Sequence, residues 1–186
     1  MNWKWTDLVV HPDDSNIWAC CKIIEGGGAQ LFVFQNGANS HTVGVSKIFE
    51  RSPMKLNPTT FLARFSLSNP GCIVCTLGQN GGQGSFVVTF DVRNQEPEVV
   101  SITHLDGIII SKLEISEAYI FAGSEDGAVF VFTEENCSPL QNVDLFEVEK
   151  KVGKEKSEKV NYDLAVNRVD SMMTVVGNGG IFQYGL

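Results

Sequence analysis

Four times along the chain, a short apolar segment runs into a glycine-containing turn and then into a second apolar segment that ends in an aromatic residue. These segments are residues 18–34, 72–90, 119–132 and 172–184. Asp-Gly and Gly-Gly are favoured in tight hairpin turns because glycine adopts positive φ with little strain. The pattern therefore predicts four β-hairpins.

The hairpins recur at a regular interval and have further strand-like segments around them. Their closing aromatics, Phe34, Phe90, Phe132 and Tyr184, lie 56, 42 and 52 residues apart, near the 40–50 residues of a β-propeller blade. An apolar segment precedes each hairpin, and another follows each of the first three. The segments before the hairpins are 7–11, 60–66, 108–115 and 162–167, and those after them are 41–49, 98–104 and 143–148. We therefore predict an all-β chain with four blades of antiparallel strands near 7–49, 60–104, 108–149 and 160–186, the last blade incomplete.

The stretch from Phe121 to Phe132, read as FAGSEDGAVFVF, resembles a degenerate WD repeat. The Trp-Asp ending of that family is absent, and Phe90-Asp91 is the nearest substitute. The resemblance implies one WD-repeat β-propeller over residues 1–186. It also implies a structural hydrogen bond between a His before the inner strand and an Asp in the hairpin turn, positions that His104 and Asp126 occupy.

Composition and charge narrow the class of protein. Hydrophobic residues make up 43% of the chain and charged residues 19%, which favours a folded core. The uncharged apolar runs are far shorter than the roughly 18–20 residues of a membrane helix, so we expect a soluble protein without a membrane span. The net charge of -8 argues against direct binding to nucleic acid and favours a basic protein partner. The first residues lack the pattern of a signal peptide, so we expect an intracellular location, cytoplasmic or nuclear.

Motifs for chemistry are scarce. The five cysteines lie in apolar segments and are expected to be reduced core residues, because Cys72 and Cys75 have no second pair at zinc-ligand spacing. The glycine-rich residues 78–84 precede a strand, whereas a phosphate loop needs a helix behind it. The sequence at 11–14, His-Pro-Asp-Asp, is typical of a turn. We therefore predict no catalytic residue, no metal and no cofactor.

A propeller presents its connecting loops at the two ends of the ring. We expect a non-catalytic scaffold for protein or peptide partners, acting within a multi-subunit complex. In WD-repeat geometry the loops near 50–59, 79–84, 104–107, 124–127 and 150–160 share one face. The predicted partner-binding residues on it are Arg51, Met54, Lys55, Gln79, Asn80, Asp106, Glu125, Asp126 and Lys154.

Two other interpretations remain open. A propeller enzyme or small-ligand binder would use the central channel and would need ionisable side chains converging from the inner strands, which here read as mostly Val, Ile, Leu and Phe. A β-sandwich recognition domain also suits many short strands, although the regular period of the hairpins counts against it.

Ring closure is the second open matter. Blade four lacks an outer strand, which could come from residues 3–5 (Trp-Lys-Trp), from a partner, or from a longer chain. Without one, the strand near 180–184 keeps an unpaired edge that invites strand pairing or oligomerisation.

Overall fold

The computed structural model describes residues 2–25, 28–44, 58–79, 81, 83–94, 96–144, 162–167, 172–177 and 180–185. In these residues the regular structure is entirely β-strand. The strands are β1 (Trp3–Val10), β2 (Ile17–Ile24), β3 (Gly28–Gln35), β4 (Ala38–Gly44), β5 (Pro58–Phe65), β6 (Cys72–Gln79), β7 (Gly84–Asp91), β8 (Glu98–Leu105), β9 (Ile110–Ile115), β10 (Tyr119–Ser124), β11 (Ala128–Thr133), β12 (Pro139–Asp144), β13 (Tyr162–Val166), β14 (Met173–Gly177) and β15 (Gly180–Tyr184).

The strands form four antiparallel sheets, each a simple meander in chain order. We call them blades 1 to 4: β1–β4, β5–β8, β9–β12 and β13–β15. The first strand of each blade lies innermost, where β1 packs on β5, β5 on β9 and β9 on β13. The predicted hairpins and the three-stranded last blade are confirmed.

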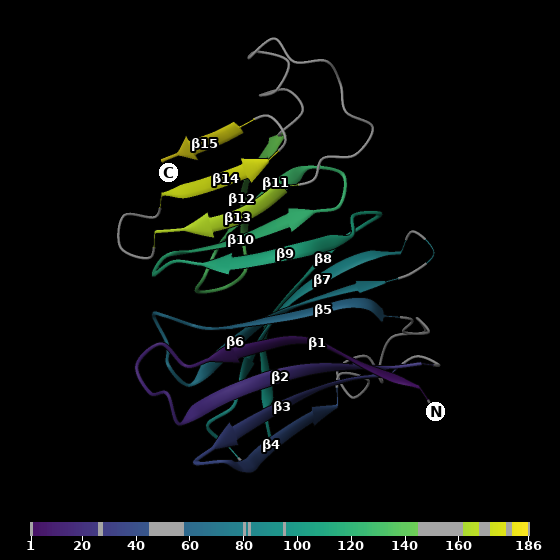
Figure 1. Ribbon diagram of the computed structural model, residues 1–186, viewed down its shortest axis with the longest axis vertical. Helices are drawn as coiled ribbons and strands as arrows, with labels where there is room; N and C mark the ends of the chain where they lie inside the picture. The colour runs from purple at the N-terminus through teal and green to yellow at the C-terminus, as the bar shows by residue number, and fades with distance from the viewer. Residues whose placement is uncertain are drawn as a thin grey trace.

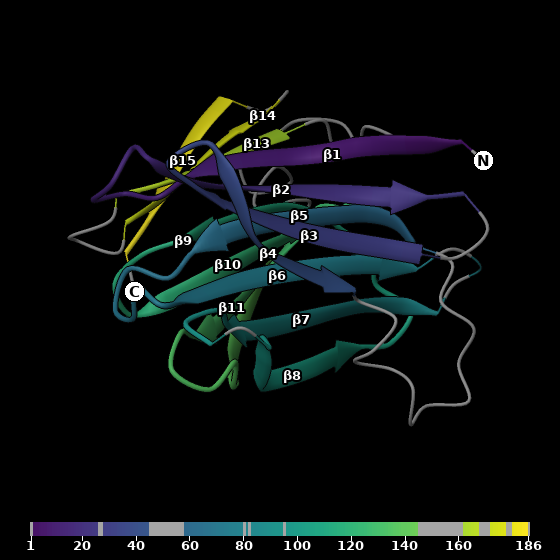
Figure 2. The same cartoon turned by 90° about the horizontal axis from the view of Figure 1, so that it is seen from below.

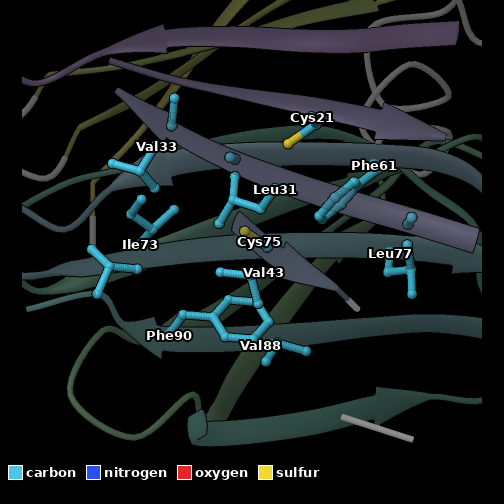
Figure 3. Close-up of a cluster of buried hydrophobic side chains, with 14 of the residues drawn as sticks. Cys21, Leu31, Val33, Val43, Phe61, Ile73, Cys75, Leu77, Val88 and Phe90 are labelled. Carbon is cyan, nitrogen blue, oxygen red and sulfur yellow. The ribbon is translucent and has the colours of Figure 1, made fainter. Parts of the chain in front are cut away.

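The blades follow one another in an arc that is not closed into a ring (Figure 1). Blade 1 lies at one end of the stack and blade 4 at the other (Figure 1). Seen from below, blade 1 lies in front and the strands of blade 4 lie behind it (Figure 2). Three apolar clusters join blade 1 to 2, blade 2 to 3 and blade 3 to 4. Between blades 1 and 2, Cys21, Leu31 and Val43 meet Phe61 and Cys75 across the sheets (Figure 3).

Each junction also has a hydrogen bond from a side chain to a main-chain carbonyl of the neighbouring blade. Thr6 Oγ1 donates to Phe61 O at 2.6 Å, and Thr60 Oγ1 donates to Ile110 O at 2.8 Å. At the third junction, Tyr162 Oη donates to Ser124 O at 2.8 Å. These hydrogen bonds fix the position of one blade relative to the next along the strand direction, because apolar packing alone is not directional.

Two predicted strand boundaries and one of the alternatives for ring closure need correction. Residues 3–5 do not complete blade 4: they belong to β1, where Trp3 pairs with Ile24 and Trp5 with Lys22. The first outer strand begins at Ala38 rather than at residue 41, because Asn36 and Gly37 both take positive φ and reverse the chain in two residues. The predicted outer strand at 143–148 starts earlier, at Pro139, and residues 145–148 lie outside the described residues.

The five cysteines are all buried and unpaired, as predicted. The described residues contain no helix with the length and apolar character needed to cross a membrane.

Candidate functional site

Three turns meet at one end of the blades and form a continuous surface. Glu125 N in the β10–β11 turn donates to Ile109 O at 2.9 Å, and Ile110 N donates to Ser85 Oγ at 2.8 Å. His104 Nε2 donates to Gln83 O at 2.8 Å. We call this surface the loop face and define it by residues 83–84, 104–109 and 125–127. Hydrogen bonds between turns make it a rigid surface rather than three separate loops.

Gly84 shows how closely two of these turns approach. Its φ is +84°, and a Cβ atom at this position would lie 1.9 Å from Leu105 O and 2.7 Å from Gly107 N. A larger residue would therefore suffer both backbone strain and a clash with main chain. The glycine in this turn is required by close contact, which is why β7 and the β8–β9 turn can share one surface.

The β10–β11 turn is held by Ser124. Its Oγ accepts a hydrogen bond from Ala128 N at 2.9 Å and donates one to the Asp126 carboxylate. Tyr162 from blade 4 binds the Ser124 carbonyl, as described above. Burial, and next the negative charge of Asp126, raise the pKa of Tyr162 well above its usual range. Hydrogen bonds from both blade 3 and blade 4 therefore hold the β10–β11 turn in place.

A second polar cluster lies on the inner strands. Arg64 on β5 binds Asp7 on β1 and Glu114 on β9, each at 2.9 Å, and so links blades 1, 2 and 3. Burial opposes the charge of Arg64, but its hydrogen bonds to Glu114 and Asp7 outweigh that effect and raise its pKa. Lys112 and Asp163 form a further ion pair between β9 and β13 at 3.1 Å, in which the ammonium lowers the pKa of Asp163.

A cavity of about 240 Å³ borders the Arg64 cluster. Besides Asp7, Arg64 and Glu114, it is lined by Leu8, Val9, Val10, Pro12, Phe65, Leu67 and Ile115. Arg64 also donates to Ala63 O at 2.6 Å, so its guanidinium is engaged on three sides by the protein itself. This arrangement serves to join the inner strands.

Three natural solved structures similar to this chain are β-propeller or WD40 domains. The β-propeller domain of Myceliophteria thermophila Cps50 (Swd1) matches 99% of the chain with a TM-score of 0.59 and 9% identity. The WD40 β-propeller domain of Doa1 matches 96% with a TM-score of 0.55 and 12% identity. The chain has the fold of a WD40 β-propeller. A computationally designed protein, Ika4, also matches 98% of the chain, with a TM-score of 0.61 and 14% identity.

The arc of four blades spans about half of the length of the natural domains that it matches. It covers 54% of the Cps50 (Swd1) domain and 49% of the Doa1 domain. For the C-terminal WD40 domain of Sif2, the covered share is 44% at a TM-score of 0.59 and 11% identity. The designed Ika4 is covered over 91% of its length. No protein-family model and no curated protein matches the sequence, so the likeness concerns the fold.

The propeller geometry brings together part of the predicted partner-binding set. Asp106, Glu125 and Asp126 are exposed and lie on the loop face. Gln79 does not fit its predicted role, because it is only 1% exposed at the end of β6 and cannot contact a partner. The other predicted residues, Arg51, Met54, Lys55, Asn80 and Lys154, lie outside the described residues.

The predicted hydrogen bond between His104 and Asp126 is not formed. His104 is paired with Phe86 across β7 and β8, and the two rings stack at 4.5 Å. Its Nε2 is used by Gln83 O, while the Asp126 carboxylate binds Ser124. The physical reason is that the ring of His104 is held within blade 2, where stacking and the Gln83 carbonyl satisfy it.

The expectation of an apolar channel is also corrected. Asp7, Arg64 and Glu114 converge from three inner strands of the propeller, although these strands also carry many apolar residues. The signal available in the sequence was a basic residue, Arg64, on an inner strand whose two neighbouring inner strands carry acidic residues, Asp7 and Glu114. Among the described residues, no three His, Cys, Asp or Glu side chains gather as metal ligands would.

Proposed function

We propose that this propeller is a non-catalytic scaffold that binds a basic peptide or protein segment on its loop face. The observation that carries the proposal is the presence of three exposed carboxylates, Asp106, Glu125 and Asp126, on turns that are hydrogen-bonded to one another. Because the turns are fixed before a partner arrives, binding does not require them to be ordered, which favours affinity.

The charge of the chain supports a basic partner. The net charge is -8, and acidic patches attract basic segments over distances comparable with the Debye length. Lys or Arg side chains of the partner would form charge-assisted hydrogen bonds with the three carboxylates. Such contacts govern association rate and specificity, so binding should weaken as salt is raised.

The proposed partner-binding surface extends beyond the described residues. We include the predicted residues Arg51, Met54, Lys55, Asn80 and Lys154 in the partner-binding surface, since the WD-repeat pattern predicts that their loops share one face. We further propose that residues 1–186 act as one domain in a multi-subunit complex inside the cell. Five buried and unpaired cysteines support a reducing compartment.

A channel ligand is not proposed. The Arg64 cluster supplies the converging charges that such a site needs, but Arg64 already binds Asp7, Glu114 and the Ala63 carbonyl. A ligand would have to displace these partly buried contacts.

The test is binding of the whole chain to an array of Lys- and Arg-rich peptides, followed by fluorescence anisotropy on the peptides that bind. The variant D106N/E125Q/D126N removes three charges and keeps the shape of each side chain. We expect its Kd to rise about tenfold or more at low salt, the effect of losing about 1.4 kcal/mol of attraction.

The matched control is E96Q/E98Q/E117Q. These three side chains are also exposed, but they lie at the opposite end of the meander: Glu96 precedes β8, Glu98 is its first residue, and Glu117 lies between β9 and β10. The control variant should bind as the wild type does. Equal weakening by both variants, or no binding of basic peptides by the wild type, would contradict the proposal.

A further inference from the structure

Blade 1 has one sheet face that carries a row of aromatic and aliphatic side chains and looks away from blade 2. Trp18 stacks on Phe34 with ring centres 3.9 Å apart, and Trp5 lies edge-on to Phe32 at 5.6 Å. Lys22 lies 4.9 Å from the Trp3 ring centre. Leu8 and Val10 on the same face are 65% and 56% exposed, and Trp3 and Trp5 are 55% and 47% exposed. Apolar patches of this kind mark contact surfaces.

The hairpin register shows which position this face holds in the repeat. In blades 2 and 3 the closing aromatics, Phe90 and Phe132, are directly opposite Ile73 and Ile120 on the neighbouring strand. Both pairs are buried against the preceding blade. Blade 4 repeats this arrangement with Tyr184 opposite Met173.

In blade 1 the same position is held by Phe34, which is directly opposite Trp18. Its residues on the other side of the sheet, Ala19 and Val33 among them, pack on blade 2. The aromatic face of blade 1 is therefore the face that, in every later blade, meets a preceding blade. It has the side chains of a blade junction without a preceding blade in the arc.

Blade 4 presents the matching half of a junction. Its face away from blade 3 carries Thr174, Val176, Ile181 and Gln183, of which Val176 and Ile181 are 46% and 71% exposed. The equivalent positions in blade 2 are Val74, Thr76, Val87 and Thr89, and Val74 and Val87 pack on blade 3. Both sets combine β-branched aliphatic side chains with uncharged polar ones.

We propose that a second copy of this chain closes the ring, with blade 4 of each copy packed on the aromatic face of blade 1 of the other. Each copy has four blades, so a ring of two copies would have twice that number. Known propellers typically have about four to eight blades. The arc covers 54% and 49% of two natural propeller domains, so two arcs amount to one ring. A head-to-tail contact that closes after two copies gives a twofold dimer with two identical junctions.

The first experiment measures the mass of the 186-residue chain by light scattering after size-exclusion chromatography. The monomer mass is 20.4 kDa, and we expect twice that value at micromolar concentration. A monomer at this concentration would overturn the proposal, whether a different protein or further blades of a longer chain cover the face instead.

The second experiment separates the head-to-tail ring from other dimers. L8E places a charge on the blade 1 face and I181K places one on the blade 4 face, at side chains already 65% and 71% exposed. Each should raise the Kd of the dimer by about 100-fold or more, the scale of interface hot spots. V100E, at an outer-strand residue of blade 2 that is 53% exposed, is the control and should remain dimeric.

Circular dichroism at low temperature identifies variants that are still folded, and only those count. If L8E is a monomer while I181K remains a dimer, the two blade 1 faces pair with each other and the head-to-tail ring is wrong. If V100E dissociates the dimer as well, the contact lies on the outer strands and the proposal also fails.

Discussion

Blade 2 and blade 4 have the same hairpin pattern but very different burial. Every side chain of β6 is buried, and so are the side chains of β7 from Gly84 to Phe90. In β14 only Met173 and Val175 are buried, and the strands of blade 4 have five residues each. The difference arises because blade 2 has a neighbour on each face, while blade 4 has one. In a repeat fold, the stability of a unit depends on its interfaces as much as on its own sequence.

The largest expected loss of stability comes from removing a closing aromatic, and it tests how far a blade depends on its interfaces. Phe90→Ala removes a fully buried ring between blades 1 and 2, and we expect a loss of about 3–5 kcal/mol in the free energy of unfolding. Tyr184→Ala, at the same position in blade 4, should cost about 1–2 kcal/mol because that ring is only partly buried. Urea denaturation of both variants measures the difference. Equal losses in the free energy of unfolding would mean that interfaces with other blades stabilise blades 2 and 4 to the same extent.

A medium effect is expected at the cluster that joins blades 1, 2 and 3. Arg64→Met removes both ion pairs and leaves Asp7 and Glu114 without their counter-charge. The side chains are 17–32% exposed, so we expect a loss of about 2 kcal/mol, below the 3–5 kcal/mol of a fully buried pair. Arg64→Lys keeps the charge but cannot bridge both carboxylates, and it should lose less. A lysine variant as unstable as the methionine variant would argue that packing of the guanidinium, and not its charge, matters.

The smallest effect concerns the link from blade 4 to blade 3. Tyr162→Phe removes the hydrogen bond to Ser124 O and should lower the free energy of unfolding by about 1 kcal/mol at neutral pH. The raised pKa of Tyr162 means that the folded state keeps the phenol proton when the unfolded chain has lost it. Its contribution is therefore complete below pH 10 and falls as the pH rises above that value.

Denaturation of wild type and Tyr162→Phe between pH 8 and 11 measures this dependence. The wild type should lose stability more steeply above pH 10 than the variant does. Parallel curves would show that Tyr162 ionises equally in both states.

Sequence patterns predicted the hairpins because local rules determine them: glycine turns, apolar strands and a closing aromatic act within about 20 residues. The Arg64 cluster was missed for the opposite reason. Asp7, Arg64 and Glu114 are about 50 residues apart along the chain, and only the packing of three blades brings them together. The exposed carboxylates of the loop face were predicted from turn positions, whereas the burial of Gln79 depends on the length of β6 and could not be read locally.

The positions of the cysteines give the chain a set of internal chemical reporters. Cys20 and Cys21 lie in blade 1, Cys72 and Cys75 in blade 2, and Cys137 follows the last-but-one strand of blade 3. Burial raises the pKa of the Cys20, Cys21, Cys72 and Cys75 thiols, so each reacts with a thiol reagent only when its surroundings open. The alkylation rates of Cys21 and Cys75, which lie at the junction of blades 1 and 2, therefore report how often these two blades separate, without any added label. Cys20 lies on the aromatic face of blade 1 itself, so its reactivity also reports whether that face is covered.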